Sequence, residues 1–456
     1  MPVAPPVAPP VAPVAAPPAA FAPPLRDIAL SLAFLAAFIW LCQAGYATGS
    51  SADLRAWWMA SDSLAAGQPL AVYPAETEVF TMRPVADWHA RALARGEETA
   101  LYPYLYPPLW VALGAPLTRI FSFAQAAQLA SLLNPLLLAA MILLARRAAA
   151  IPLRLPVAVL LGLVLTGGTV IGWPALYENQ PQILVAALVV LAVERDRSGA
   201  PLQAGAALAL AAALKLYPAL FVLVWLLAGR ARPLVSFMLV GGALGLGSIA
   251  LAGWPLHRLF LDQMGIVSGS VMLTNINYNL DALFAQIFLL DQMQHIPAMT
   301  TRPAHLVDEL SWYVLAKGPV WAAASKLAML AAVAGMALAM RRRSPAAQAA
   351  YGWPAMMIAL ALVAPLSWSY HYLAPAAFAP ALLTAFGRRR GGLLLAAVFV
   401  PISIPMLIPV NRLLPLQSAT QFTGTLAMLV LGAAFALALY RAPRAGRQNG
   451  RTTLPE

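Results

Sequence analysis

The stretch Ser51-Ala-Asp-Leu-Arg-Ala-Trp-Trp-Met-Ala-Ser-Asp-Ser-Leu-Ala-Ala-Gly-Gln-Pro-Leu70 follows the first long apolar run of the chain. Its larger apolar residues recur three, four and seven positions apart, which is the spacing of one face of a helix. We expect this helix to lie flat at a membrane surface, with Arg55 and Asp62 on its wet side. Gly67 and Pro69 are expected to end it.

Asp53 stands at the start of this predicted helix, where a carboxylate is within reach of water and of a substrate arriving from the lipid. Two interpretations are open. The residue is a candidate general base, or it is only the N-cap of the helix, a position that aspartate commonly occupies.

The composition places the chain among polytopic membrane proteins. Of its 456 residues, 61% are hydrophobic and 10% are charged, and the mean hydropathy is +0.75, far too apolar for a water-soluble domain of this size. The net charge of +12 comes from short arginine clusters at the ends of apolar runs, which act as orientation signals. No basic domain stands apart from these runs, so we expect no nucleic-acid partner. The single cysteine, Cys42, excludes an intramolecular disulfide framework and is expected to be a packing residue.

The chain divides into a central membrane domain and two tails. Residues 1–25 repeat Pro-Val-Ala-Pro-Pro and are expected to form a disordered, extended cytoplasmic tail and not a signal peptide. Residues 26–441 form the predicted transmembrane domain, and residues 442–456 a second disordered tail. The positive-inside rule places both termini in the cytoplasm and leaves two long outer loops, at about 47–121 and 254–318.

The predicted fold is all-α, with about 12 transmembrane helices and interfacial helices in the first outer loop. The apolar run 201–227 is too long for one span, so we expect two short spans hinged at Lys215-Leu-Tyr-Pro218. With this count the arginine clusters fall on the cytoplasmic side. Arg119 is the one basic residue that does not fit.

Several polar residues fall at the outer ends of predicted spans, although they are scattered through the sequence. Each has a structural alternative: Lys215 as a lysine that snorkels to the interface, His371 as part of an aromatic belt, and Glu178, Asn179 and Gln180 as caps of the fourth span. Their common position favours one outward-facing cleft between membrane and water. There Lys215 would meet an anionic headgroup such as a lipid phosphate.

The familiar motifs of soluble enzymes are missing. The sequence has no Walker loop, no dinucleotide-binding glycine pattern, no His-Glu-x-x-His and no Gly-x-Ser-x-Gly. The sequence therefore lacks the motifs that are typical of nucleotide-driven pumps, dehydrogenases, zinc hydrolases and serine hydrolases. An outer carboxylate without a nucleotide site fits chemistry on lipid-borne substrates.

Five segments, taken in order, resemble family 87 of the membrane glycosyltransferases of GT-C type. The resemblance covers about residues 27–440. The segments are Leu-Ala-Ala-Gly-Gln-Pro-Leu-Ala-Val-Tyr73, Tyr106-Pro-Pro-Leu-Trp110, Glu178-Asn-Gln-Pro-Gln-Ile-Leu-Val185, Ala211-Ala-Ala-Leu-Lys-Leu-Tyr-Pro218 and Ala364-Pro-Leu-Ser-Trp-Ser-Tyr-His371.

The resemblance implies a donor and a set of site residues. Members of this family use polyprenyl-phosphate sugars, commonly mannose and in some cases arabinofuranose, outside the cytoplasmic membrane, without nucleotide and usually without metal. By resemblance Asp53 corresponds to the catalytic carboxylate, and Lys215 and His371 lie near the donor phosphate. The segment Thr274-Asn-Ile-Asn-Tyr-Asn279 departs from an Asn-Gln-Ser-like pattern often seen in the second outer loop, which bears on the acceptor. The expected substrate-binding residues are Tyr106, Glu178, Asn179, Gln180 and Trp368.

The resulting hypothesis is an inverting hexosyltransferase of the cytoplasmic (inner) membrane that acts on its outer face. Its partners would be a polyprenyl-phosphate donor, a lipid or glycan acceptor and membrane lipids, and we expect no cofactor and no metal site. A carboxylate with its ordinary pKa is already ionised at neutral pH, so we expect no large shift at Asp53. The alternatives are a flippase for a lipid-linked sugar, an arabinofuranosyltransferase of the same family and a non-catalytic scaffold.

Overall fold

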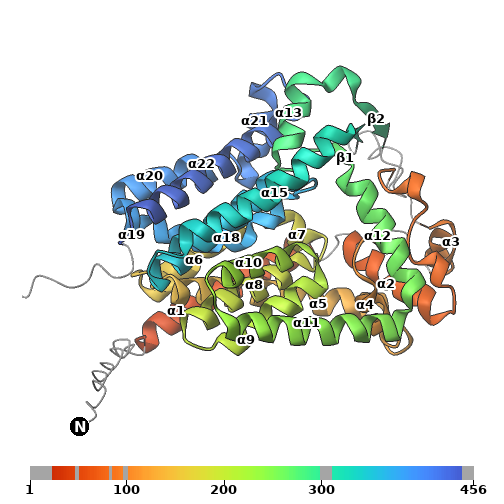
Figure 1. Ribbon diagram of the computed structural model, residues 1–456, viewed down its shortest axis with the longest axis horizontal. Coiled ribbons are helices and arrows are strands. Elements are labelled where there is room, and N and C mark those ends of the chain that lie inside the picture. Colours follow the sequence, from red (N-terminus) through yellow and green to blue (C-terminus); the bar gives the residue numbers. More distant parts are fainter. Residues whose placement is uncertain (1–22, 47–50, 82–84, 96–100, 298–310, 444–456) are drawn as a thin grey trace, which may run out of the picture.

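The computed structural model describes residues 23–46, 51–81, 85–95, 101–297 and 311–443, which form a bundle of mainly apolar helices (Figure 1). The tails predicted for residues 1–25 and 442–456 lie almost entirely outside the described residues. So do short pieces of both outer loops.

Long apolar helices dominate the described chain. Six segments are long and apolar enough to cross a membrane by length and composition. These helices support a membrane protein, while the total of about 12 spans stays a prediction. The six are α1 (Leu25–Tyr46), α5 (Phe123–Ala148), α11 (Ala231–Ala252), α15 (Pro319–Met340), the continuous segment Pro345–Val363 that ends in α17 (Trp353–Val363), and α22 (Ala419–Arg441).

Shorter helices fill the space between the long ones. Three of them, α6, α9 and the segment Tyr217–Leu227, are apolar helices of 10–17 residues. The shorter helices are α6 (Leu155–Gly167), α7 (Trp173–Tyr177), α8 (Gln182–Arg197), α9 (Pro201–Leu214), η4 (Tyr217–Val222), α10 (Leu223–Leu227), α18 (Leu373–Phe378), α19 (Leu382–Phe386), α20 (Arg388–Phe399) and α21 (Leu407–Leu413).

The hinge predicted at Lys215 is confirmed. Helix α9 ends at Leu214, the backbone of Lys215 is extended (φ −142°, ψ 137°), and the chain resumes as the 3-10 helix η4. Pro218 has no backbone N–H and fixes its own φ, so it favours a break in the helix just before it. The run therefore places one lysine between two short helices.

The arginine-rich turns gather at the end of the bundle where α1 begins and α22 finishes (Figure 1). Buried acids there tie neighbouring helices together. This grouping agrees with the predicted cytoplasmic side. The ion pairs are Arg154 with Asp27, Arg147 and Arg195 with Glu194, and Arg230 with Asp196.

The opposite end of the bundle carries the two outer segments. The first contains α2 (Ala52–Ala65), α3 (Ala86–Ala94) and α4 (Pro108–Gly114), and the second begins with α12 (Trp254–Ser268) and includes α13 (Leu280–Phe288). Figure 1 shows α2, α3 and α12 side by side at this end, and α12 also packs on α4.

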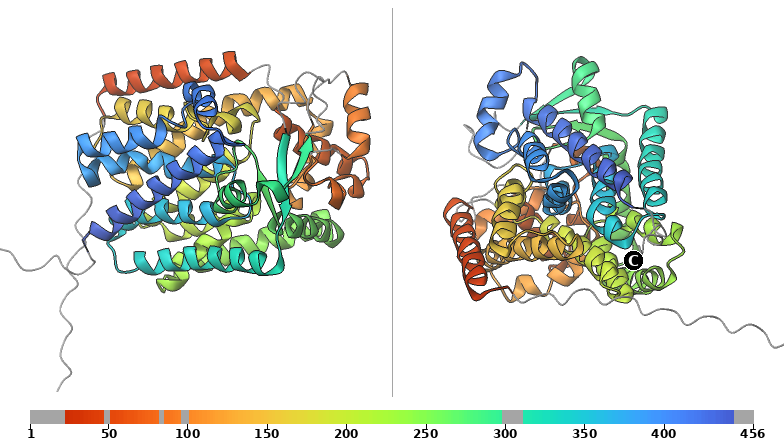
Figure 2. Two further views of the ribbon diagram at one scale, coloured as in Figure 1. Left: turned by 90° about the horizontal axis from the view of Figure 1, so that it is seen from above. Right: turned by 90° about the vertical axis from the view of Figure 1, so that its left-hand side faces the viewer.

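The described part of the chain is nearly all-α, as predicted, but its second outer segment also contains a small β-sheet, which the prediction missed. Strands β1 (Ser270–Leu273), β3 (Ser311–Ala316) and β2 (Gln294–Pro297) pair antiparallel in the order β1-β3-β2, with Ser270 opposite Ala316. The left view of Figure 2 shows the strands between the bundle and the outer helices. Strands of four to six residues give almost no periodic signal in a sequence, so only their pairing reveals them.

Contrary to the prediction, Arg55 does not lie on a water-exposed side of α2. This side chain is buried at 5% exposure, and its guanidinium lies 3.8 Å from the centroid of the Phe123 ring, a cation–π contact at the start of α5. Trp58 packs against the same ring. Helix α2 is therefore covered by protein on the side that carries Arg55.

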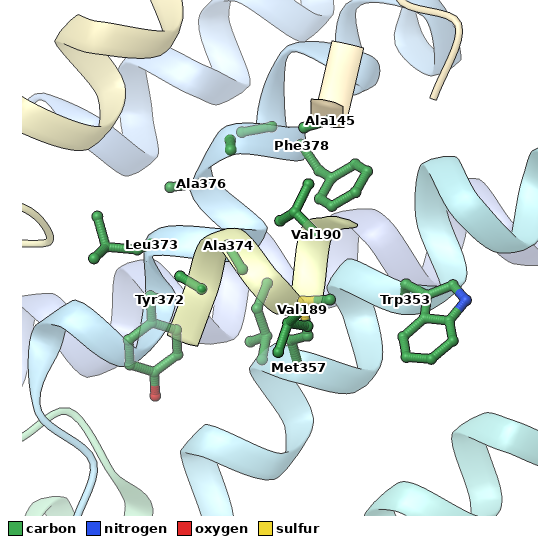
Figure 3. Packing of buried hydrophobic residues seen from close by; sticks show 14 of the residues in the cluster. Ala145, Val189, Val190, Trp353, Met357, Tyr372, Leu373, Ala374, Ala376 and Phe378 are labelled. Carbon is green, nitrogen blue, oxygen red and sulfur yellow. The ribbon is translucent and has the colours of Figure 1, made fainter. Parts of the chain in front are cut away.

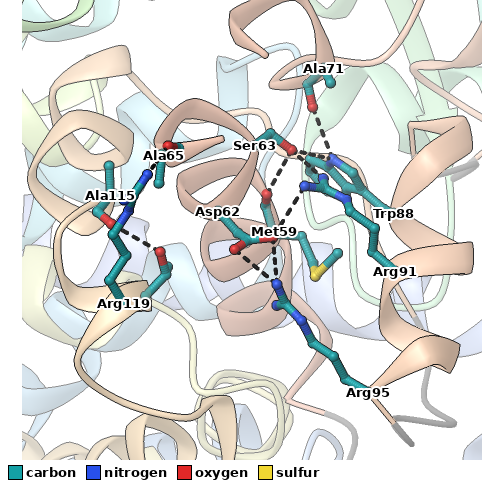
Figure 4. A network of polar contacts seen from close by, with 11 residues as sticks. Met59, Asp62, Ser63, Ala65, Ala71, Trp88, Arg91, Arg95, Ala115 and Arg119 are labelled. Carbon is teal, nitrogen blue, oxygen red and sulfur yellow. Dashed lines mark hydrogen bonds and ion pairs between the residues drawn. The ribbon is translucent and has the colours of Figure 1, made fainter. Parts of the chain in front are cut away.

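Asp62 and Arg119 anchor the far end of α2 (Figure 4). The Asp62 carboxylate accepts hydrogen bonds from Arg91 and Arg95 on and just after α3. The guanidinium of Arg119 donates to the carbonyl of Ala65, the last residue of α2, where orphan carbonyls favour a cation. Arg119 is therefore a helix anchor, which explains why it did not fit the topology rule.

The centre of the bundle is closely packed around α18. Figure 3 shows Tyr372, Leu373 and Ala374 against Val189 of α8 and Met357 of α17. Tyr372 and Leu373 have no exposed surface. Because this packing fixes the start of α18, it also fixes the turn just before it, which carries His371.

Close approach of α9 and α11 gives a first prediction. A Cβ at Gly205 of α9 would collide with the backbone carbonyl of Pro233 and lie 2.8 Å from the Phe237 nitrogen on α11. We expect Gly205→Ala to destabilise the protein by about 1–3 kcal/mol, since backbone cannot yield as a flexible side chain does. The measurement is the melting temperature in detergent. The control Gly242→Ala, where the new methyl meets open space, should not lower it; equal melting temperatures for the two variants would contradict the packing described.

Candidate active site

Asp53 lies in the first turn of α2, half-buried, but it is not the N-cap. The cap position is Ser51, whose side chain makes no capping hydrogen bond. Instead Glu178, from the loop between α7 and α8, accepts a hydrogen bond of 2.7 Å from the Ala52 nitrogen. The positive end of the helix dipole also stabilises a carboxylate at this position. Glu178 thus caps α2, not the fourth span, and leaves the Asp53 carboxylate available for other contacts.

Gln180 makes the contact with Asp53. Its side-chain Nε2 donates to Asp53 Oδ2 and, at 3.1 Å, to the hydroxyl of Tyr370, while its Oε1 accepts from the hydroxyl of Tyr106 at 2.7 Å. Asp53 and Tyr106 belong to the first outer segment, and Tyr370 belongs to the 3-10 helix η7 (Ser369–Tyr372). Gln180 itself is 1% exposed.

Asn179 shapes the loop that delivers Glu178 and Gln180. Its backbone is left-handed (φ 49°), a conformation that asparagine adopts more readily than most residues. The side chain is held on both sides, because Asn134 donates to Asn179 Oδ1 at 2.8 Å and Asn179 Nδ2 donates to the Ser51 hydroxyl at 2.9 Å. The sharp turn places the side chains of Glu178 and Gln180, on either side of Asn179, against α2.

Lys215 sits between two aromatic rings. Its ammonium nitrogen lies 5.2 Å from the centroid of the Tyr106 ring and 5.1 Å from that of Tyr370, within the range of cation–π attraction. The backbone before it is fixed by α4, since Trp110 Nε1 donates to the carbonyl of Ala213 at 2.7 Å. Lys215 is therefore held half-buried within protein and does not extend freely into the interface as a snorkelling lysine would.

His371 lies in the short 3-10 helix η7 (Ser369–Tyr372), close to the same cluster. Its ring centroid is 5.3 Å from that of Tyr217 and 5.4 Å from that of Tyr370. The turn is anchored by Ser369, whose hydroxyl donates to the Val170 carbonyl at 2.7 Å. The structure thus brings residues 53, 180, 215 and 371 to one place, as predicted.

Trp368 and the segment 274–279 pack against the η7 turn that carries His371. The Trp368 ring stacks on that of Tyr370, with centroids 6.3 Å apart, and its backbone pairs with Asn277. The three asparagines of the segment are engaged by protein groups, so the segment supports the site from behind. Asn275 accepts from Ser418, Asn277 accepts from the Ser367 nitrogen, and Asn279 donates to the carbonyls of Ala364 and Pro365.

The electrostatics of Asp53 correct the expectation of an ordinary pKa. Burial raises the pKa of Asp53 to about 6, and the positive charge of Lys215 and the hydrogen bond from Gln180 hold it from rising further. The same effects act on His371: burial, and then the nearby Lys215 charge, lower its pKa well below the usual value. At neutral pH the site therefore combines an ionised Asp53 with a neutral His371.

An apolar cavity of about 50 Å³ adjoins the His371 end of the cluster. Tyr217 of η4, Leu360 of α17 and Ser367 are among its walls, whereas Asp53 and Lys215 do not line it. This cavity is therefore a small space beside His371 that does not extend to Asp53. Within the described part of the chain, no group of three or more His, Cys, Asp or Glu side chains is arranged to hold a metal ion.

Sequence reasoning did not single out two residues of this cluster, Tyr370 and Tyr217. Tyr370 touches Gln180, Lys215 and His371, and Tyr217 packs on His371. Both lie within the quoted motifs, one residue before His371 and two after Lys215. Proximity to a candidate residue was the only signal that could have identified them, because tyrosines are common near membrane surfaces.

Comparison with known proteins assigns the family. A model of glycosyltransferase family 87 matches residues 104–365, more than half of the 456-residue chain. The match includes Tyr106, Gln180 and Lys215, whereas Asp53 precedes it and His371 follows it. No curated protein matches the chain significantly. On this match, and with its long apolar helices, the chain belongs to glycosyltransferase family 87 and is a membrane glycosyltransferase.

Proposed function

We propose that this enzyme transfers a hexose, with mannose as the leading candidate, from a polyprenyl monophosphate to an acceptor hydroxyl, with inversion at the anomeric carbon. One observation carries the proposal. A half-buried carboxylate, Asp53, and a half-buried ammonium, Lys215, lie together at the outer end of the bundle and influence each other electrostatically. A base and a phosphate-binding cation are the two groups that such a transfer needs.

Asp53 is the general base of the proposed mechanism. The acceptor oxygen attacks the anomeric carbon while Asp53 removes the hydroxyl proton, and the bond from that carbon to the phosphate oxygen breaks with its electron pair on the phosphate. The attack and the departure occur on opposite faces of the sugar, so a single displacement inverts the configuration. A base with a pKa of about 6 is mostly ionised at neutral pH and binds a proton more readily than an exposed carboxylate does.

Lys215 and His371 stabilise the leaving phosphate. Negative charge on the phosphate grows as the glycosidic bond breaks, and a cation held in a water-poor site stabilises that charge more than it would in bulk water. Neutral His371 contributes one N–H donor. The ring contacts of Tyr106 and Tyr370 with Lys215 hold the ammonium in place before the donor arrives.

The cavity beside His371 is too small to hold the donor. Its volume of about 50 Å³ is far below the roughly 300–1,000 Å³ of typical ligand pockets. We propose that the outer segments move apart to admit the sugar phosphate. The site faces the outer side of the cytoplasmic membrane in this proposal, because the arginine-rich turns lie at the other end of the bundle.

A direct assay tests the function. Purified protein in lipid, incubated with radiolabelled polyprenyl-phosphate mannose and a crude envelope lipid extract, is expected to give a labelled product with a new glycosidic bond. Polyprenyl-phosphate arabinofuranose serves as the competing donor. Movement of the donor across a reconstituted bilayer without any new glycosidic bond would replace the transferase by a flippase.

Replacement of the proposed base gives a second test. We expect Asp53→Asn to lower kcat by about 10²–10⁴-fold, the usual contribution of general base catalysis. The matched control is Asp62→Asn on the same helix, whose carboxylate binds Arg91 and Arg95 instead. The amide oxygen introduced by Asp53→Asn still accepts from Gln180, although Lys215 loses its opposite charge, and the melting temperature at pH 7 checks that the variant is folded. Full sugar transfer by Asp53→Asn would remove the base assignment.

The pH profile gives a third test. The free enzyme needs ionised Asp53, whose pKa is about 6, so kcat/KM should fall about tenfold per pH unit below that value. A base with an ordinary pKa near 4 would keep full activity down to about pH 5. Initial rates between pH 4.5 and 8 at a fixed low donor concentration distinguish the two, and an acid limb near pH 4 would contradict the burial of Asp53.

A further inference from the structure

Gln180 is the residue through which the first outer segment, the α7–α8 loop and the η7 turn meet. Its two amide N–H groups are used by Asp53 and Tyr370, and its oxygen accepts from Tyr106. With 1% of its surface exposed, it has no amide hydrogen left for a sugar hydroxyl. A substrate contact would have to displace a protein partner first.

The orientation of this amide follows from its partners. An ionised carboxylate only accepts hydrogen bonds, so the NH₂ end of Gln180 must face Asp53. The reverse orientation would bring the amide oxygen against the carboxylate, with no proton between two acceptors. Tyr106 reinforces the observed orientation, because its hydroxyl donates to the amide oxygen.

The supports of Gln180 also hold Lys215. Tyr106 and Tyr370 bind the two ends of the amide through their hydroxyls and flank the ammonium of Lys215 with their rings. The backbone of Gln180 is fixed as well, since its nitrogen donates to the Ala175 carbonyl at 2.8 Å. The amide of Gln180 and the two tyrosine side chains therefore fix the position of the Asp53 carboxylate relative to the Lys215 ammonium.

Resting on the proposed function, we propose that Gln180 is a positioning residue: its amide holds the Asp53 carboxylate in one orientation beside Lys215 and does not bind the sugar. This replaces the substrate-binding role that the sequence predicted for it. Positioning of a base within a fraction of an ångström affects the rate of proton transfer more than the affinity for substrate.

The inference has a pH signature. The charged and titratable groups around Asp53 are Lys215 at the end of α9, Tyr106 before α4, Tyr370 in η7 and Glu178 beside the α2 terminus. Of the neighbours, Lys215 and Gln180 favour the ionised carboxylate. Loss of the Gln180 hydrogen bond therefore raises the pKa of Asp53 further, whereas loss of a pure substrate contact leaves it unchanged.

The test is Gln180→Met, which keeps the volume and removes the hydrogen bonds. We expect kcat to fall about 10- to 100-fold with little change in KM, and the acid limb of kcat/KM to move up by about one pH unit. The matched control is Gln182→Met, two residues along the chain. Gln182 is also fully buried and donates to the Tyr217 hydroxyl at 2.8 Å, so its loss should leave the acid limb where the wild type has it.

A second variant keeps the inference testable if Gln180→Met fails to fold. Tyr106→Phe retains the ring against Lys215 and removes only the hydroxyl that orients the amide, so the acid limb should move in the same direction by a smaller amount. An unshifted acid limb in the folded variant, or a raised KM with unchanged kcat, would overturn the positioning role. If Asp53→Asn is fully active, the proposed function itself fails; if it is inactive while the Gln180 variants keep the wild-type profile, only this inference fails.

Discussion

The hydrogen bond from the Gln180 amide to the Asp53 carboxylate connects the first outer segment to the helical bundle at the candidate active site. A carboxylate in a half-buried site is costly unless its charge is compensated, and here the compensation comes from one amide and one ammonium. The rest of the site follows from this constraint. Tyr106 and Tyr370 fix the amide, and their rings hold Lys215 close enough to act on Asp53.

Several hydrogen bonds between side chains and the backbone hold the contributing segments against one another. Glu178 caps α2 and therefore ties the α7–α8 loop to the first outer segment. Trp110 ties α4 to the last turn of α9 through the Ala213 carbonyl, and Asn277 ties the second outer segment to the turn that carries His371. Each of these hydrogen bonds satisfies a polar backbone group that would otherwise be buried without a partner. The polar side chains of these loops are thus used mainly to hold the segments in place. Few of them remain available to bind a substrate.

The balance of burial and charge gives the two candidate proton-transfer groups opposite states. Burial raises the pKa of Asp53 and lowers that of His371, and the Lys215 charge lowers both. Near pH 7 the site therefore contains a carboxylate that can accept a proton and an imidazole that can donate a hydrogen bond without a positive charge. A neutral His371 leaves the positive charge of this cluster on Lys215.

The sequence by itself determined the class of the protein and the parts of its site. Composition, arginine clusters and helical periodicity predicted long apolar helices, the end of α2 just before Gly67 and the break at Lys215, because hydrophobic burial and chain breaking are local properties. Only the tertiary structure decided which groups meet. The capping of α2 by Glu178, the burial of Arg55 on Phe123, the β-sheet and the occupation of the Gln180 amide all join residues more than 40 positions apart or short segments without periodicity. Such pairings depend on the packing of distant segments, and no local pattern encodes them.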